Sequence, residues 1–341
     1  MDLTRRDFMK IVGVAALGTA VGNTFTIKEH ALAADKNKYR ANRSQVPGYF
    51  RLKLGSAVEI TALGDGFGIV SPAFFKDFTS LTEEELDNLL NRDFVSRTKE
   101  GVAMAVINAF LVNTGEHLVL VDAGKGYVDG EIFLEKHGLL TRFLRDAGYT
   151  PKDIDVILPT HLHADHICGV EENGKCVFPN ATIYLAEEEK RYWLDSDISS
   201  LSKTQQFAAE IARTALKPYL DAKRVKVFAP GDEVFPHVKS VPLFGHTPGH
   251  TGYMISSGEQ NLFIWGDLLH IKSIQLPHPE VGIVFDTDAA EACKTRAAML
   301  PKLAEKKQLV CGAHLPFPGI GYLEKLGENY HFHPVEYQIY H

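Results

Sequence analysis

Segment 160–166 reads THLHADH. Three histidines and an aspartate thus lie within six consecutive residues, 161–166. Imidazole and carboxylate groups gain little from burial, and each needs a partner when it is buried. A metal ion supplies such partners at once, because imidazole nitrogen and carboxylate oxygen are ligands of zinc and similar metals. In an extended segment His161 and His163 point to the same side, which suits one metal. Asp165 and His166 follow where the chain turns.

Three further segments carry acid or imidazole groups after predicted strands or in a glycine-rich turn. Segment 245–251 (GHTPGHT) holds two histidines, segment 265–267 (WGD) ends in an aspartate, and segment 311–314 (CGAH) ends in a histidine. A single residue of this kind is more often a structural residue whose hydrogen bonds are satisfied within the protein than a metal ligand. Four segments with the same chemistry at strand ends favour one shared site.

Apolar runs predict the strands that would position these segments. Strands are expected at 154–158, 238–243, 253–256 and 262–265, with a last buried strand at 309–312. Two more, at 103–112 and 117–121, are joined by Asn113-Thr114-Gly115-Glu116, a hairpin signal. The second of these ends in Asp122, where a carboxylate is costly unless it orients a metal-bound histidine.

Helical spacing and turn residues complete the expected organisation. Helices are predicted at 81–90, 132–147, 205–219 and 289–304, and Gly64, Gly66 and Gly68 predict a loop. No linker separates two cores, so the sequence favours one α/β domain.

The overall composition is that of a globular protein, with 45% hydrophobic and 23% charged residues among 341. The formal net charge is -7 and no basic block is present, which argues against nucleic acid as a partner. The four cysteines form no C-x-x-C pair, so a cysteine zinc site is not indicated. Cys168 and Cys176 are near enough in sequence to form a disulfide, although buried free thiols are the favoured interpretation.

The N-terminal residues predict an export signal. Residues 4–10 (TRRDFMK) resemble a twin-arginine motif, and the apolar run 11–21 is too short to span a bilayer. Ala31-Leu32-Ala33 is a small-x-small cleavage site. We therefore expect a signal peptide over 1–33 and one mature domain over 34–341. The twin-arginine translocation machinery would deliver it to the periplasm or outside the cell. An uncleaved amphipathic anchor is the alternative.

The four histidine and aspartate segments, taken in order, resemble the metallo-β-lactamase superfamily. The resemblance implies a four-layer αβ/βα sandwich, with two mixed β-sheets flanked by helices and two divalent metal ions at one edge of the sheets. It assigns His161, His163 and His250 to one metal, Asp165, His166 and His314 to the second, and Asp267 to both. Asp122 and His246 are expected to support these ligands. Ligation by nitrogen and oxygen alone favours zinc, and it also suits manganese, iron or cobalt.

Several segments further resemble the methyl parathion hydrolase branch, which also contains N-acyl-homoserine lactonases. They are 111–115 (LVNTG), 178–181 (FPNA) and 313–321 (AHLPFPGIG). This resemblance implies an exported hydrolase, commonly a homodimer, that cleaves lactone, ester or phosphotriester bonds with a hydroxide bridging two metals. Asp165 would orient that hydroxide, and Asp267 would hold both metals.

The substrate is expected to lie in an aromatic-lined pocket. Trp193 matches a pocket tryptophan of the branch, Phe207 lies near another pocket aromatic, and Tyr127 falls in a stretch that departs from the branch. Two alternatives stay open: an amide hydrolase of the β-lactamase type, and an exported zinc-binding protein without turnover.

Overall fold

The computed structural model describes residues 48–97, 103–126 and 138–337. The predicted signal peptide, the arm that follows it and Tyr127 lie outside the described residues. Among the helices of the described part, none is long and apolar enough to cross a membrane.

The first seven-stranded sheet has the order β1-β2-β3-β4-β5-β8-β9. Its strands from β1 to β4 pair antiparallel, and those from β4 to β9 pair parallel, so the sheet is mixed. The bounds are β1 (Tyr49–Leu54), β2 (Val58–Val70), β3 (Ala103–Asn113), β4 (Leu118–Val121), β5 (Val156–Leu158), β8 (Thr182–Ala186) and β9 (Val225–Phe228).

The second seven-stranded sheet runs in sequence order from β10 to β16. Only β13 and β14 pair parallel, so this sheet is mixed as well. The bounds are β10 (Glu233–Phe235), β11 (Val238–Pro242), β12 (Thr251–Ser257), β13 (Gln260–Ile264), β14 (Leu309–Cys311), β15 (Ile320–Leu326) and β16 (Asn329–Pro334). A separate small hairpin pairs β6 (Glu171–Glu172) with β7 (Lys175–Cys176).

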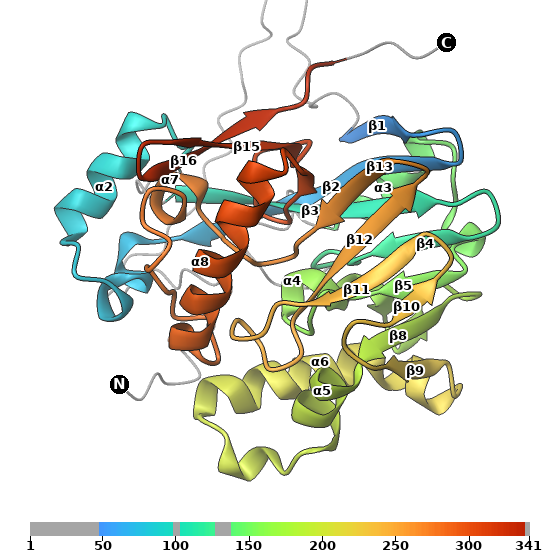
Figure 1. Ribbon diagram of the computed structural model, residues 1–341. Helices are drawn as coiled ribbons and strands as arrows, with labels where there is room; N and C mark the ends of the chain where they lie inside the picture. The colour runs from blue at the N-terminus through green and yellow to red at the C-terminus, as the bar shows by residue number, and fades with distance from the viewer. Residues whose placement is uncertain (1–47, 98–102, 127–137, 338–341) are drawn as a thin grey trace, which may run out of the picture.

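Helices cover the outer faces of the sheets (Figure 1). They are α2 (Glu83–Arg92), α3 (Leu140–Asp146), α4 (Ala164–Ile167), α5 (Glu187–Lys190), α6 (Lys203–Asp221), α7 (Lys272–Gln275) and α8 (Ala289–Glu305). Helices α3 and α6 pack on the first sheet, and α8 packs on the second.

Strand β3 shows why the layers form. Its residues Phe110 and Val112 join the core between the two sheets, whereas Ala109 and Leu111 join the core under α3 and α6. Successive side chains of a strand point to opposite faces, so a strand buried on both faces reads as a continuous apolar run. The predicted four-layer sandwich of two mixed sheets is confirmed.

Two details differ from the sequence-based expectations. The glycines at 64, 66 and 68 lie within β2, where the register shifts between Gly64 and Gly66. This bulge buries Asp65, whose carboxylate accepts hydrogen bonds from the backbone N–H groups of Lys125 (2.8 Å) and Leu140 (3.1 Å). Segment 309–312 is also not the last strand, because β15 and β16 follow as a hairpin whose alternating polar residues face outward.

Candidate metal centre

The predicted ligand segments all leave the carboxyl ends of strands. The histidine segment 160–166 follows β5, Asp267 follows β13, and His314 follows β14, while His246 and His250 lie in the turn between β11 and β12. Strands β13 and β14 are adjacent and parallel, so their following residues meet at one edge of the sheet. The fold therefore brings together residues that are more than 150 positions apart.

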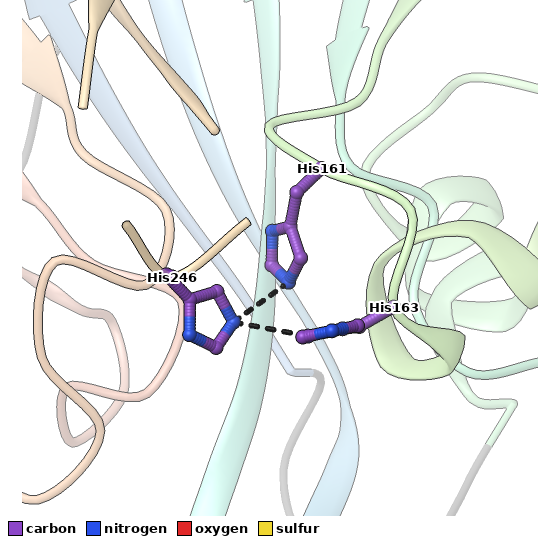
Figure 2. A group of neighbouring side chains, drawn as sticks. All are labelled: His161, His163 and His246. Atoms are coloured by element: carbon purple, nitrogen blue, oxygen red, sulfur yellow. Dashed lines mark hydrogen bonds between the residues drawn. The ribbon is translucent and has the colours of Figure 1, made fainter. Parts of the chain in front are cut away.

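His161, His163 and His246 form one group of imidazoles (Figure 2). The His246 Nε2 lies 3.2 Å from the His161 Nε2 and 3.0 Å from the His163 Nδ1. The three rings come from two loops and direct these nitrogens toward one another. Three imidazole nitrogens at this spacing suit a single metal ion.

Asp165, His166 and His314 form a second group beside the first. Asp267 lies between the two: its Oδ1 is 3.3 Å from the His166 Nε2, and its Oδ2 is 3.4 Å from the His246 Nε2 and 3.2 Å from the His314 Nε2. A carboxylate that lies near imidazoles of both groups is placed to hold two neighbouring metals.

Unsatisfied polar atoms test whether a metal fits here. The His166 Nε2 and the Asp267 Oδ1 are buried, and neither has a hydrogen-bond partner in the described protein. An unpartnered buried polar atom costs about 1–3 kcal/mol. Metal ligation would remove that cost for both atoms, and all the converging donors are nitrogen or oxygen. The two groups thus suit a dinuclear site for divalent metals.

The ligand-type histidines are held by their second ring nitrogens. The His246 Nδ1 lies 2.8 Å from the Asp286 Oδ1, the His166 Nδ1 lies 2.8 Å from the Asp122 Oδ2, and the His314 Nδ1 lies 2.8 Å from the Val106 carbonyl oxygen. Such acceptors fix the tautomer and leave Nε2 free to bind a metal. The structure places Asp122 in the supporting position expected from sequence, whereas Asp286 carried no sequence motif and was missed.

Asp122 has an uncommon backbone conformation for a residue other than glycine, with a φ of 61°. Its carboxylate accepts hydrogen bonds from the Thr160 backbone N–H (2.7 Å) and the Thr160 hydroxyl (3.0 Å), in addition to its contact with His166. These three contacts hold a strained strand end that orients the histidine segment.

His250 and His246 exchange the roles predicted from sequence. The His250 Nδ1 donates to the Leu243 carbonyl oxygen (2.9 Å), and its Nε2 accepts the Asp267 backbone N–H (3.1 Å), so both nitrogens are occupied by protein groups. Burial lowers the pKa of His250 to about 4, which keeps the ring neutral as this pattern requires. The assignment of His250 as a ligand is therefore wrong in this geometry: His250 holds the backbone of Asp267, and His246 joins the metal-binding group.

Gly266 makes this arrangement possible. Its φ is +55°, and a Cβ there would lie 2.6 Å from the His250 Nε2 and 2.8 Å from the Thr160 side chain. Any larger residue would separate the loops that carry Asp267 and the histidine segment.

Electrostatics keep the carboxylates ionised in this cluster. Burial raises the pKa of Asp267, but His166 and His314 outweigh that effect and hold the pKa well below its usual range. Burial lowers the pKa of His161 and of His246 well below the ordinary value. Neutral rings such as these bind a metal directly. Burial also acts to lower the pKa of His166 and of His314, but Asp267 outweighs it and raises both, so metal binding at those rings would release a proton.

Glu189, on helix α5 just after β8, connects the two histidine loops, and no sequence motif predicted this role. Its Oε1 accepts the Leu162 backbone N–H (2.8 Å) and the Trp193 Nε1–H (2.7 Å). Its Oε2 accepts the Thr247 hydroxyl (2.7 Å) and the Gly249 backbone N–H (3.0 Å). Burial raises the pKa of Glu189 to about 7, against the lowering effect of these four donors.

A cavity of about 270 Å³ opens beside the cluster, and its lining includes Trp193, His270 and the ligand-type residues His163, Asp165, Asp267 and His314. Phe207 was predicted to line the pocket but does not. The α6 residues that line the cavity are Lys203, Thr204, Gln205, Ala208 and Ile211. The cysteines in the described residues are all free, including Cys168 and Cys176.

Comparisons with known proteins now decide the family. A model of the metallo-beta-lactamase superfamily matches residues 105–314, which include strands of both sheets and every ligand-type segment. The chain belongs to the metallo-β-lactamase superfamily. Members of this superfamily that resemble it include a probable metallo-hydrolase of Mycobacterium tuberculosis (29% identical over 191 residues) and an N-acyl homoserine lactonase of a Bacillus species (27% over 164 residues). The matches cover 50% and 43% of this chain, and only 58% and 57% of those relatives, less than two thirds of their length.

Two solved structures of the superfamily are similar over nearly the whole fold. One is the hydrolase AbOPH, with 33% identity, a TM-score of 0.79, and coverage of 87% of this chain and 100% of that chain. The other is AidC, a dizinc quorum-quenching lactonase in complex with its product N-hexanoyl-L-homoserine. It shows 30% identity, a TM-score of 0.75, and coverage of 86% of this chain and 99% of that chain. Lactonases are thus among the relatives of this metallohydrolase, as the sequence resemblance implied.

The exchanged roles of His246 and His250 can be tested by metal analysis. We expect His246→Ala to lose about one of two bound metal ions per chain, because it removes one of three converging imidazoles. His250→Ala keeps all converging donors and should retain more metal than His246→Ala, while losing about 1–3 kcal/mol of stability. Metal content of the purified variants measures this, and the reverse order of metal loss would restore the sequence-based assignment.

A second prediction concerns Glu189. Its replacement by Gln turns one of two acceptor oxygens into a donor, so two buried donors lose their acceptor. We expect Glu189→Gln to reduce the free energy of unfolding by about 3 kcal/mol in denaturant titrations. The matched control is Glu187→Gln, an exposed residue on the same short helix, which should change stability by less than about 0.5 kcal/mol. Equal stability of both variants would show that Glu189 does not hold the loops.

Proposed function

We propose that this chain is an exported metal-dependent hydrolase that cleaves lactone or carboxylic ester bonds, with phosphotriesters as a second substrate class. The observation that carries the proposal is the continuity between the metal-binding cluster and an apolar cavity. The similarity to lactonases, including one solved with an acyl-homoserine product, supports the same class.

The cavity walls favour a substrate with an apolar chain. The end at the metal-binding cluster holds Asp165, Asp267 and His314, and the rest of the lining combines apolar with polar side chains. The apolar lining residues are Ile69, Val70, Ala105, Ile107, Ala164, Trp193, Ala208, Ile211, Val284 and Phe285, and the polar ones include Lys125, Ser202, Lys203, Thr204 and Gln205. A volume of about 270 Å³ is at the small end of ligand sites, which fits an acyl chain of modest length.

The described residues divide the work of hydrolysis among them. Divalent metals, when bound, supply Lewis acidity and make water a stronger acid. Burial acts to raise the pKa of Asp165, but the neighbouring His166 and His314 outweigh that effect, and the pKa lies below its ordinary value. The carboxylate therefore stays ionised and accepts hydrogen bonds from an attacking water. Water adds its oxygen to the acyl carbon and gives up a proton, the ester C–O bond breaks, and the released alkoxide takes up that proton. Trp193 and Phe285 exclude bulk water from one side of this reaction.

We also propose, from the N-terminal sequence, that the chain is exported by the twin-arginine machinery to the periplasm or beyond. A folded metalloprotein suits that route because it takes up its metal before export. The resemblance to the methyl parathion hydrolase branch further supports a homodimer.

A substrate panel tests the reaction class. We expect zinc-loaded protein to hydrolyse N-hexanoyl-homoserine lactone and aryl esters. Asp267→Ala should lower kcat/KM by about 10³-fold, because it removes the carboxylate that lies between the two metal-binding groups. Asp221→Asn, at the exposed end of α6, is the control and should leave the rate unchanged. Full activity of Asp267→Ala would refute the mechanism. Preferred turnover of nitrocefin would favour a β-lactamase, and bound metal without any turnover would favour a metal-binding protein.

Export is tested by exchanging the two arginines of the signal. We expect Arg5→Lys combined with Arg6→Lys to retain the precursor in the cytoplasm, because the translocation machinery reads the arginine pair. Fractionation and immunoblotting measure the distribution, with Lys28→Arg as a control that keeps the pair. Unchanged export of the double variant would contradict the proposed route.

A further inference from the structure

Arg296 on α8 is a fully buried charged side chain, with 0% of its surface exposed. Arginine is rarely buried to this degree unless its donors have partners. Here the Nε donates to the Leu268 carbonyl oxygen (2.6 Å), and the Nη1 donates to the carbonyl oxygens of Pro279 (2.9 Å) and Val281 (2.7 Å). Three backbone carbonyl groups of one segment, 268–281, therefore hold the guanidinium inside the protein.

The first of these contacts lies beside Asp267. Leu268 directly follows Asp267 in the chain, so Arg296 holds the backbone next to the carboxylate that lies between the two metal-binding groups. His250 holds the same backbone one residue earlier, where its Nε2 accepts the Asp267 N–H (3.1 Å). The position of this carboxylate thus depends on a side chain of α8 as well as on the histidine turn.

The other two carbonyl groups precede a turn that presents Asp286. In this turn the Asp286 Oδ2 accepts the Ile283 backbone N–H (3.0 Å), two residues after Val281. The Asp286 Oδ1 lies 2.8 Å from the His246 Nδ1. By holding the segment before the turn, Arg296 also supports the acceptor that orients a ligand-type histidine.

Neighbouring residues of α8 contact the turn that carries His246. Gly245 has a φ of +122°, and a Cβ there would lie 2.1 Å from the backbone nitrogen of Ala292. The Thr295 hydroxyl donates to the carbonyl oxygen of residue 244 (2.8 Å). Further along the helix, Leu303 packs in the apolar core on the second sheet instead. The first half of α8 therefore contacts two ligand-bearing segments, whereas its second half contacts the core.

We propose that Arg296 is a positioning residue that fixes Asp267 and the Asp286–His246 pair at the separation that two metal ions require. A guanidinium suits this task because it offers five N–H donors in a rigid planar fork, whereas a lysine offers one compact ammonium group. Its role would be to hold ligands without touching metal or substrate, since it lies outside the cavity lining. The assignment rests on the proposed metal-dependent hydrolysis and adds to it the residue that sets the ligand geometry.

The test uses full-length protein and the variant Arg296→Met, which keeps most of the side-chain length but removes its donors. We expect zinc affinity, measured by competition with a chromophoric chelator, to fall about 10- to 100-fold. The visible absorption of the cobalt-loaded variant should change, because it reports the geometry of the ligands. The kcat for N-hexanoyl-homoserine lactone should fall about 10²-fold, as expected for a displacement of about 1 Å. Arg296→Lys, which restores one donor group, should recover part of each loss.

Leu303→Ala is the matched control. It truncates a buried side chain about two turns further along α8 and should lower the midpoint of thermal unfolding, as Arg296→Met does. Its zinc affinity, cobalt spectrum and kcat should equal those of the unmodified protein. Arg296→Gln replaces Arg296→Met if that variant does not fold.

Unchanged zinc affinity and an unchanged cobalt spectrum in the folded Arg296 variant would overturn the proposal and leave Arg296 with a structural role alone. Equal losses in Leu303→Ala would overturn it too, because they would follow from lower stability and not from ligand position. Unmodified protein that binds zinc but hydrolyses none of the substrates would instead refute the proposed function, and the two metal measurements would still decide the role of Arg296.

Discussion

The site depends on one buried carboxylate, Asp267, which is 3% exposed and lies within 4 Å of five imidazoles. An isolated ionised carboxylate at this depth would cost far more than the folded state can sustain. The surrounding imidazoles offset that cost only in part, because each of them also loses contact with water. Divalent metal ions between the carboxylate and the rings would satisfy both, so this arrangement is best understood as a ligand set.

Such a cluster requires a scaffold that does not relax. Like-charged or unsatisfied groups would move apart if the strands that carry them were free to shift. Here the two sheets pack face to face through one apolar core, and helices close their outer faces. The loops that carry the ligands are further joined to one another: Glu189 connects the two histidine loops, and His250 holds the backbone of Asp267. The packing of the apolar layers thus stabilises the fold enough to hold these polar groups at fixed positions.

The cavity opens beside the metal-binding cluster. Its lining includes Asp165, Asp267 and His314 of the cluster, together with apolar and polar side chains of β2, β3 and α6. The reaction class follows from the cluster, whereas the size and polarity of the cavity walls select the substrate.

The sequence by itself determined the fold class and most of the cluster. Apolar runs of strand length recovered the central strands, and the segment 160–166 carries four candidate ligands at a spacing that local geometry alone makes convergent. It could not separate His246 from His250, because both lie in one glycine-rich turn and only docking against His161 and Leu243 decides which ring faces the cluster. Likewise, Trp193 lines the cavity and Phe207 does not, and the packing of their segments decides this because both residues are aromatic. Glu189, His270 and Asp286 contact residues that are distant in the chain, so only the tertiary structure could place them in the site. The burial of a side chain and its distances to other side chains are properties of the packed layers and not of the local sequence.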